Sequence, residues 1–228
     1  MSSTPLDLQV LNVCAALLLL LSFAMLAQRR VVTLVNLLAV QGALLFVATL
    51  LLAWRTHQYH LYLSAALTLG IKVIFLPWLL HRLIRRLQVY WDTEPLINVS
   101  GTMLVGVLVV VFAFGLAQPI SALASTATRH AIGIAVAVVL LSFLTMITRR
   151  KAMSQVVGFL SMENGLFFGA MSATYGMPMI VELGVALDVL VAMLVLGIFF
   201  FQIREQFDSL DLHHLEALKE RHSLKEDK

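Results

Sequence analysis

An uninterrupted apolar stretch follows a pair of arginines near the start of the chain. Residues Val31 to Trp54 read VVTLVNLLAVQGALLFVATLLLAW and contain no charged side chain. About 20 consecutive apolar residues are enough for an α-helix to cross the hydrocarbon core of a bilayer. This stretch therefore predicts a transmembrane helix, with Arg29 and Arg30 at its boundary.

The composition of the whole chain is also typical of a membrane protein. Its 228 residues are 60% hydrophobic and 13% charged, and the mean hydropathy is +0.91. Soluble domains contain about 25% charged residues, so an ordinary water-soluble globule is excluded. A single cysteine, Cys14, excludes an intrachain disulfide and any zinc or iron–sulfur site built from several cysteines of this chain.

Long apolar runs, separated by Arg, His, Pro, Gly or Ser, predict seven transmembrane helices in all. The predicted ranges are 6–27, 31–54, 60–83, 99–118, 131–148, 152–173 and 179–203. The predicted fold class is therefore an all-α polytopic membrane bundle that occupies residues 1–204. Residues 205–228 are expected to form a polar tail with a short amphipathic helix, on which Leu212, Leu215 and Leu218 share one face.

The basic residues gather on one side of the predicted membrane. Of the 16 lysines and arginines, 13 fall on one side, namely Arg29, Arg30, Arg82, Arg85, Arg86, Arg149, Arg150, Lys151, Arg204, Lys219, Arg221, Lys225 and Lys228. Only Arg55 and Arg129 fall on the other. Cytoplasmic loops carry the excess of basic residues, so we expect an outside N-terminus and a cytoplasmic C-terminus. The basic pI of about 9.2 then reflects membrane orientation rather than nucleic-acid binding.

Two parts of the sequence resemble each other. Arg29-Arg30 and Arg149-Arg150 each precede an apolar helix, and Gln41-Gly42 then aligns loosely with Glu163-Asn164. The following helices align through residues 64–68 and 184–188. We interpret helices one to three and five to seven as two copies of a three-helix unit. The single helix between them gives both copies the same orientation, so this is a parallel repeat.

Besides Asp7 and Arg82, which stand next to the ends of their spans, four charged residues lie inside the predicted spans: Lys72, Glu163, Glu182 and Asp188. A charge in hydrocarbon costs about 2.5–3.5 kcal/mol on insertion scales, so each of them requires a reason. Lys72 and Glu163 lie near mid-depth, whereas Glu182 is near the end of its span. Pro77, five residues after Lys72, interrupts the helical hydrogen bonds and opens a turn that could hold water.

These residues support two interpretations. In the first, Lys72 forms a structural salt bridge with one of the acids. In the second, burial disfavours the charged forms, so that the groups exchange protons and form a relay across the bundle. No nucleophile–base pair, metal cluster or phosphate-binding loop is visible in the sequence, which argues against a membrane enzyme and leaves a free-standing small transporter as a further alternative.

The sequence resembles a known family, most specifically in its second half. Residues 158–165 read GFLSMENG, residues 181–188 read VELGVALD, and the tail carries Ser209-Leu210-Asp211. Residues 72–77 read KVIFLP. These segments resemble the E component of hydrogenase-4, a membrane subunit of formate hydrogenlyase-type complexes. The last three helices are also similar to the K subunit of respiratory complex I and the C subunit of Mrp-type antiporters.

The resemblance implies a subunit of a proton- or cation-translocating arm in the cytoplasmic membrane of a bacterium or archaeon. Its partners would be antiporter-like and other membrane-arm subunits, coupled to a peripheral nickel–iron hydrogenase. Nickel–iron and iron–sulfur centres are expected in those partners, with no cofactor in this chain. Asp188 matches the third-helix glutamate of the K subunit, and Glu163 lies about one turn from Leu160, the position of the second-helix glutamate. The alternatives are a purely structural scaffold, or an Mrp-like or complex I-like subunit outside a hydrogenase.

Overall fold

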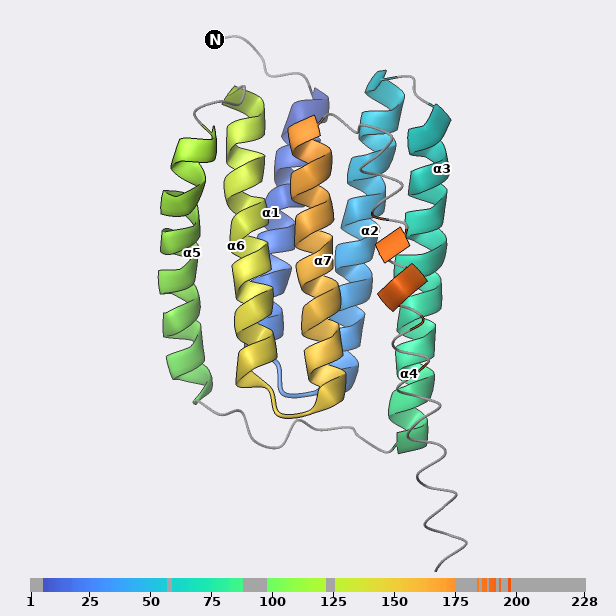
Figure 1. The fold of residues 1–228 in the computed structure, drawn as a ribbon, viewed down its shortest axis with the longest axis vertical. Coiled ribbons are helices and arrows are strands. Elements are labelled where there is room, and N and C mark those ends of the chain that lie inside the picture. Colours follow the sequence, from blue (N-terminus) through green and yellow to red (C-terminus); the bar gives the residue numbers. More distant parts are fainter. Residues whose placement is uncertain are drawn as a thin grey trace, which may run out of the picture. The chain divides into compact units, whose positions relative to one another are not determined.

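A computed structural model describes residues 6–56, 59–87, 98–121 and 126–174, together with Gly184 and a few positions from there to Gly197. Within these ranges every regular element is helical (Figure 1). Six helical spans within the described ranges are long and apolar enough to cross a membrane. The all-α polytopic fold class is therefore confirmed. The predicted seventh span and the tail lie, apart from the isolated positions, outside the described residues.

Five of the six spans are single α-helices: α1 (Leu6–Ala27), α2 (Val31–Thr56), α5 (Val99–Ser121), α6 (Thr126–Thr148) and α7 (Ala152–Thr174). The sixth is composite, since α3 (Tyr59–Thr68), a π-helical segment η1 (Leu69–Phe75) and α4 (Leu76–Leu87) follow one another directly. Most predicted boundaries agree within a few residues. Helix α6 starts at Thr126 rather than at residue 131, because Arg129 and His130 extend it beyond its apolar part.

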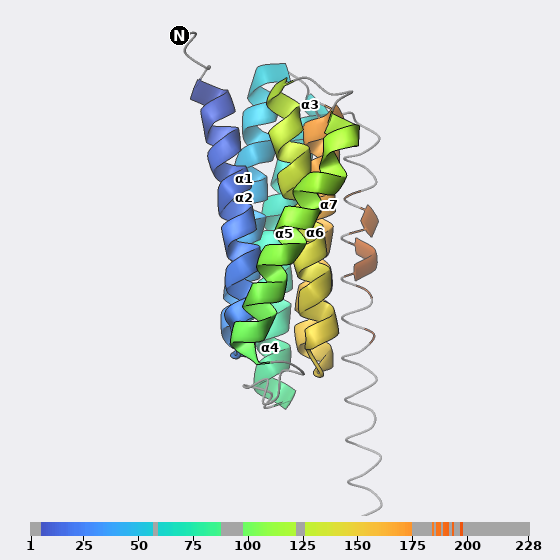
Figure 2. The same ribbon diagram turned by 90° about the vertical axis from the view of Figure 1, so that its left-hand side faces the viewer.

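Helices α1, α2, α6 and α7 pack together, and the other spans lie beside them. Contacts join α1 to α2 and α6, and α7 to α2 and α6, while α5 packs on α6 and α1. The composite span packs on α2. Figures 1 and 2 show α1 and α2 behind α6 and α7, with α5 and the composite span at the two edges. The shared core draws on all four central helices, through Cys14, Ala15, Leu18, Leu45, Ala48, Ala131, Ala135, Val138, Phe167, Phe168 and Met171.

Glycines on α7 bring it close to α6. A Cβ atom built on Gly158 would lie 2.7 Å from Met146 Cγ, and one on Gly165 would lie 2.8 Å from Val138 Cγ1. The backbone nitrogen of Val139 would also be only 3.2 Å from the Gly165 Cβ. Helices in a membrane associate through close van der Waals packing, which small residues permit. These glycines therefore set the distance between α6 and α7.

Matching serine contacts support the interpretation of a repeat. Gln41 Nε2 on α2 donates to Ser22 Oγ on α1 at 3.0 Å, and Ser142 Oγ on α6 lies 2.8 Å from Ser161 Oγ on α7. In both pairs the residues are 19 positions apart. Helices α1 and α6 begin at the same end (Figure 1), as a parallel repeat requires. In this register Gln41 corresponds to Ser161. The sequence alignment instead matches Gln41 with Glu163, two residues further along the chain.

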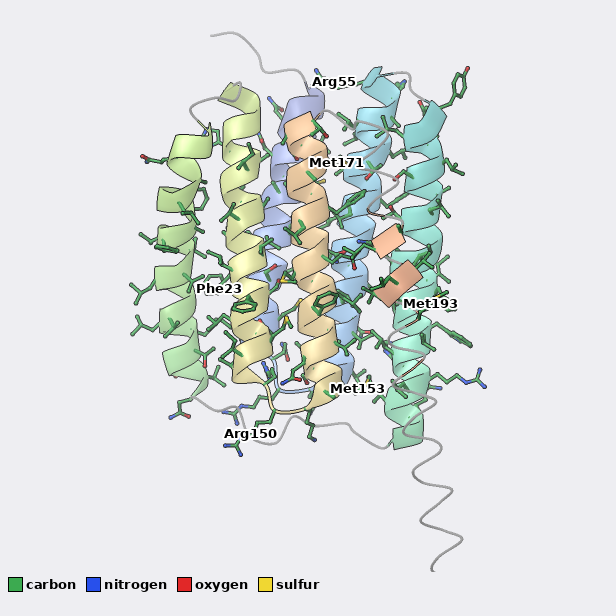
Figure 3. All side chains as sticks on the ribbon, viewed as in Figure 1. Phe23, Arg55, Arg150, Met153, Met171 and Met193 are labelled. Carbon is green, nitrogen blue, oxygen red and sulfur yellow. The ribbon has the colours of Figure 1, made fainter. Side chains whose placement is uncertain are left out.

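One arginine of the predicted basic side has a structural role as well. The side chain of Arg149 is 3% exposed. Its Nη2 donates to the carbonyls of Met25, Leu26 and Gln28, at the C-terminal end of α1. A cation there satisfies carbonyls that have no partner within the helix and interacts favourably with the helix dipole. Figure 3 places the neighbouring Arg150 at the opposite end of the helices from Arg55, as the sorting of basic residues predicts.

Adding one methyl group at Gly165 should destabilise the bundle. In the G165A variant the new Cβ meets the Val138 side chain and the Val139 backbone, so we expect a loss of about 1–3 kcal/mol in the free energy of unfolding. The matched control is G115A, because a Cβ on Gly115 of α5 meets nothing within 4 Å. Unfolding of both variants in detergent gives the comparison. Equal stability of G165A and G115A would contradict the close α6–α7 packing.

Candidate functional site

Two of the charged residues that the sequence places inside the spans meet in the structure. Lys72 Nζ on η1 lies 3.0 Å from Glu163 Oε1 on α7, and the side chains are only 4% and 2% exposed. Removing either partner alone would leave an uncompensated charge in a medium that solvates it poorly. The ion pair thus joins the composite span to the second half of the chain at a depth where water is scarce.

A chain of hydrogen bonds extends from the ion pair across three more side chains. Lys72 Nζ donates to Asn164 Oδ1 at 3.0 Å, and Asn164 Nδ2 donates to Gln41 Oε1 at 3.5 Å. Gln41 Nε2 donates to Ser22 Oγ at 3.0 Å, and Ser22 donates to the carbonyl of Leu18 at 3.0 Å. We call Ser22, Gln41 and Asn164 the amide chain. It links η1, α7, α2 and α1.

The amide chain has a defined direction. The hydroxyl of Ser22 has one proton, which goes to the carbonyl of Leu18, so its oxygen accepts from Gln41. The amide of Gln41 then presents its oxygen to Asn164, and the oxygen of Asn164 accepts from Lys72. An amine donates to an amide oxygen in both its charged and its neutral form. The amide chain can therefore hold Lys72 in place whatever the charge of the lysine.

The backbone around Lys72 is shaped for the close approach of α2. A Cβ on Gly42 would lie 3.2 Å from both Lys72 Cβ and the Lys72 carbonyl oxygen, so no larger residue fits there without displacement. The segment η1 is a π-helix of seven residues, in which the backbone N–H of Leu76 donates to the carbonyl of Ile71. It ends at Phe75, two residues before Pro77. The turn that the sequence predicts to open at Pro77 is therefore a wider helical segment, a feature frequent at functional sites.

Two further features border the ion pair. The ring of Phe167 lies with its centroid 5.2 Å from Lys72 Nζ, a cation–π contact, and a Cβ on Gly184 would lie 2.6 Å from the same ring. A small cavity of about 10 Å³ adjoins the pair and is lined by Leu38, Lys72, Leu76, Leu160, Glu163 and Asn164. That volume corresponds to about one water molecule, and polar groups of the kind a buried water needs are present.

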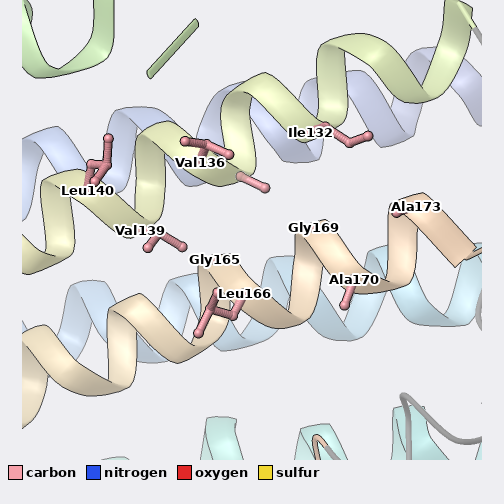
Figure 4. A pocket seen from close by; sticks show the side chains of 10 residues that line it. Ile132, Val136, Val139, Leu140, Gly165, Leu166, Gly169, Ala170 and Ala173 are labelled. Carbon is pink, nitrogen blue, oxygen red and sulfur yellow. The ribbon is translucent and has the colours of Figure 1, made fainter. Parts of the chain in front are cut away.

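A larger pocket of about 390 Å³ lies elsewhere, between α6 and α7 (Figure 4). All the residues that line it are apolar: Ile132, Ala135, Val136, Val139, Leu140, Gly165, Leu166, Gly169, Ala170 and Ala173. It therefore offers nothing that would bind an ion. Among the described residues, no three His, Cys, Asp or Glu side chains come together as a metal site.

The structure thus brings together Lys72 and Glu163, with Pro77 two residues beyond the segment η1 that carries Lys72. Glu182 and Asp188 lie outside the described residues, so their part in a relay stays a prediction. The amide chain was not predicted from the sequence as a connected unit. The signal was present, because a glutamine and an asparagine inside apolar spans need hydrogen-bond partners as charges do.

Comparison with known proteins places the chain in a family. It is 35% identical over 204 residues to the uncharacterized protein Rv0085 of Mycobacterium tuberculosis, a match that covers 89% of this chain and 93% of that one. The chain belongs to the same family as Rv0085. It is also 27% identical over 175 residues to hydrogenase-4 component E of Escherichia coli K12, covering 77% of this chain and 76% of that protein. Component E of Shigella flexneri matches to the same extent. No protein-family model matches the chain, and neither does any solved structure.

Homology to hydrogenase-4 component E confirms the resemblance that the sequence motifs indicate. The aligned region covers about three quarters of both chains, so it extends well beyond the quoted motifs. Each match covers most of the length of the related protein, 93% for Rv0085 and 76% for component E. The similarity therefore extends over most of the chain rather than one local segment.

The ion pair predicts strong coupling between its members. Lys72→Met and Glu163→Gln should each lower the free energy of unfolding by about 3–5 kcal/mol, because each leaves one buried charge without its partner. The loss in free energy of unfolding of the double variant should be smaller than the sum of the two single losses by at least about 1 kcal/mol. Unfolding of the four proteins in one detergent measures this coupling. Strictly additive losses would show that the two groups do not interact.

Proposed function

We propose that this chain is a non-catalytic membrane subunit of a nickel–iron hydrogenase complex of the hydrogenase-4 type, related to respiratory complex I. In this role it would dock antiporter-like subunits, and its Lys72–Glu163 pair would take part in the translocation of protons or other cations. The homology to hydrogenase-4 component E supports the assignment to such a complex. The single observation that supports the translocation role is a buried, hydrogen-bonded ion pair in the middle of an apolar bundle.

Proton transfer within the pair would cost little electrostatic energy. When the proton of the Lys72 ammonium moves to the Glu163 carboxylate, an ion pair becomes a neutral pair and the total charge in the hydrocarbon stays the same. Asn164 accepts from Lys72 in either state, so the lysine needs no new partner. A proton passed on from Glu163 to a neighbour would have to be replaced at Lys72 in the same step, so that the pair never holds a single uncompensated charge.

The cavity beside the pair suggests how such a step would continue. Its volume of about 10 Å³ suits one water molecule, placed between Lys72, Glu163 and Asn164. A water molecule there would extend the hydrogen-bonded path beyond the two side chains. Asp188 and Glu182 are the further members that the sequence predicts for the path.

A structural scaffold is the second candidate function. It is favoured by the way in which the described buried charges are held, since Lys72 and Glu163 pair with each other and Arg149 caps α1. In that case the chain would hold its neighbours in register while ions pass through them. An Mrp-like or complex I-like subunit outside a hydrogenase would use the same bundle.

Ion movement by the assembled complex separates these candidates. The K72M/E163Q double variant removes both ionisable groups while avoiding an unpaired charge. We expect it to assemble and to reduce the number of ions moved per hydrogen molecule at least about tenfold, the size of effect expected when an essential proton-transfer group is lost. The measurement is proton uptake or release by proteoliposomes that contain the purified complex.

The matched control is S142A/S161A, which removes a buried hydrogen bond of the corresponding helix pair without removing an ionisable group. It should move ions at the parental ratio. If K72M/E163Q does so as well, the scaffold is the correct function. Nickel in the purified complex tests the hydrogenase assignment separately, and a pure complex that contains no nickel would refute it.

A further inference from the structure

Helix α4 is strongly amphipathic where the composite span leaves the hydrocarbon. One of its faces is buried against the bundle, with Leu79 5% exposed and Leu80, Leu83 and Ile84 at 1% or less. The other face carries Trp78, which is 53% exposed, followed by the exposed residues Arg82 and Arg85. The apolar span that includes α4 ends at Arg85. The two arginines therefore stand at the depth of a membrane boundary.

These outer residues form one continuous stripe. Residues 78, 82 and 85 follow at spacings of four and three, so their side chains share one helix face. The guanidinium carbon of Arg82 lies 5.3 Å from the centre of the Trp78 ring, a cation–π contact. The rings of Phe75 and Trp78 are 6.5 Å apart, and Phe75 is 38% exposed. The stripe thus changes from two aromatic rings to two guanidinium groups along the helix.

We propose that this stripe, formed by Phe75, Trp78, Arg82 and Arg85, binds a phospholipid whose headgroup carries a net negative charge. Guanidinium groups bind phosphate through paired, charge-assisted hydrogen bonds, and two of them one turn apart can reach the same phosphodiester. Stacking on Trp78 orients the guanidinium of Arg82. The aromatic rings lie toward the hydrocarbon, where they contact the upper part of an acyl chain.

The chemistry of the stripe favours a lipid over a free phosphate ion. A phosphate ion would use only Arg82 and Arg85, and nothing would explain the exposed rings immediately on the membrane side of them. A net negative headgroup is favoured over a zwitterionic one, because it meets two exposed guanidinium groups. The predicted cytoplasmic side agrees, since the anionic lipids of that leaflet attract basic segments.

The test measures lipid binding to the purified, detergent-solubilised protein by native mass spectrometry with phosphatidylglycerol and phosphatidylcholine. We expect phosphatidylglycerol to bind the parent protein at least about tenfold more tightly than phosphatidylcholine. Removing both charges in R82Q/R85Q should weaken phosphatidylglycerol binding by about thirtyfold, which is the combined effect expected for two basic residues at an anionic surface. Replacing the ring in W78L should weaken it by a smaller factor, about threefold, through loss of the cation–π contact.

The control variant is R29Q/R30Q, which removes two exposed arginines from the turn between α1 and α2, at the same end of the helices. It should change phosphatidylglycerol binding less than about threefold, as expected for charges outside the binding site. An equal loss in both double variants would show general attraction to charge and overturn the proposal. Complete displacement of the lipid by an equal concentration of inorganic phosphate would overturn the lipid assignment. None of these outcomes depends on whether the chain belongs to a hydrogenase.

Discussion

A polar group inside a hydrocarbon core has no water to bind, so it must find its partner within the protein. In this chain that constraint acts most strongly on Lys72 and Glu163, whose 3.0 Å contact joins two distant parts of the sequence. Neighbouring residues make this contact possible. Gly42 lets the π-helical segment approach α2, and Asn164 gives the lysine a second acceptor. Without such partners, either charge would oppose insertion of its helix.

The ion pair can stabilise the bundle and carry protons with the same atoms. Its charged and neutral forms have the same total charge, so a proton can cross the 3.0 Å between Nζ and Oε1 without creating a lone ion. The amide chain ends at the carbonyl of Leu18, and its direction lets it support Lys72 in both forms. A wholly structural pair would need neither the adjoining cavity nor the π-helical segment, although it would tolerate both.

Much of the fold could be predicted because it depends on properties that are local in the sequence. Span length and apolarity determine the six described spans, and the intramembrane charges stand out for the same reason. Which charges meet depends on helix packing. The sequence therefore predicts that Lys72 pairs with one of the acids inside the spans, but it does not show which one. An arginine at the end of an apolar run indicates orientation, but the contacts of Arg149 with α1 could not be predicted, because they form only in the folded bundle. The π-helix was not predicted as such, and Pro77 was the feature of the sequence that indicated an irregular helix there.

If Lys72 and Glu163 exchange a proton, Glu163 changes its protonation state while the complex works. Infrared difference spectroscopy of the purified complex, comparing the resting enzyme with the enzyme during turnover, detects this change through the carbonyl band of a protonated carboxylic acid. We expect such a band to appear or disappear during turnover and to be absent from the E163Q variant. A spectrum that is the same in the parent and in E163Q would show that Glu163 keeps one protonation state throughout, and would rule out proton transfer from Lys72 to Glu163.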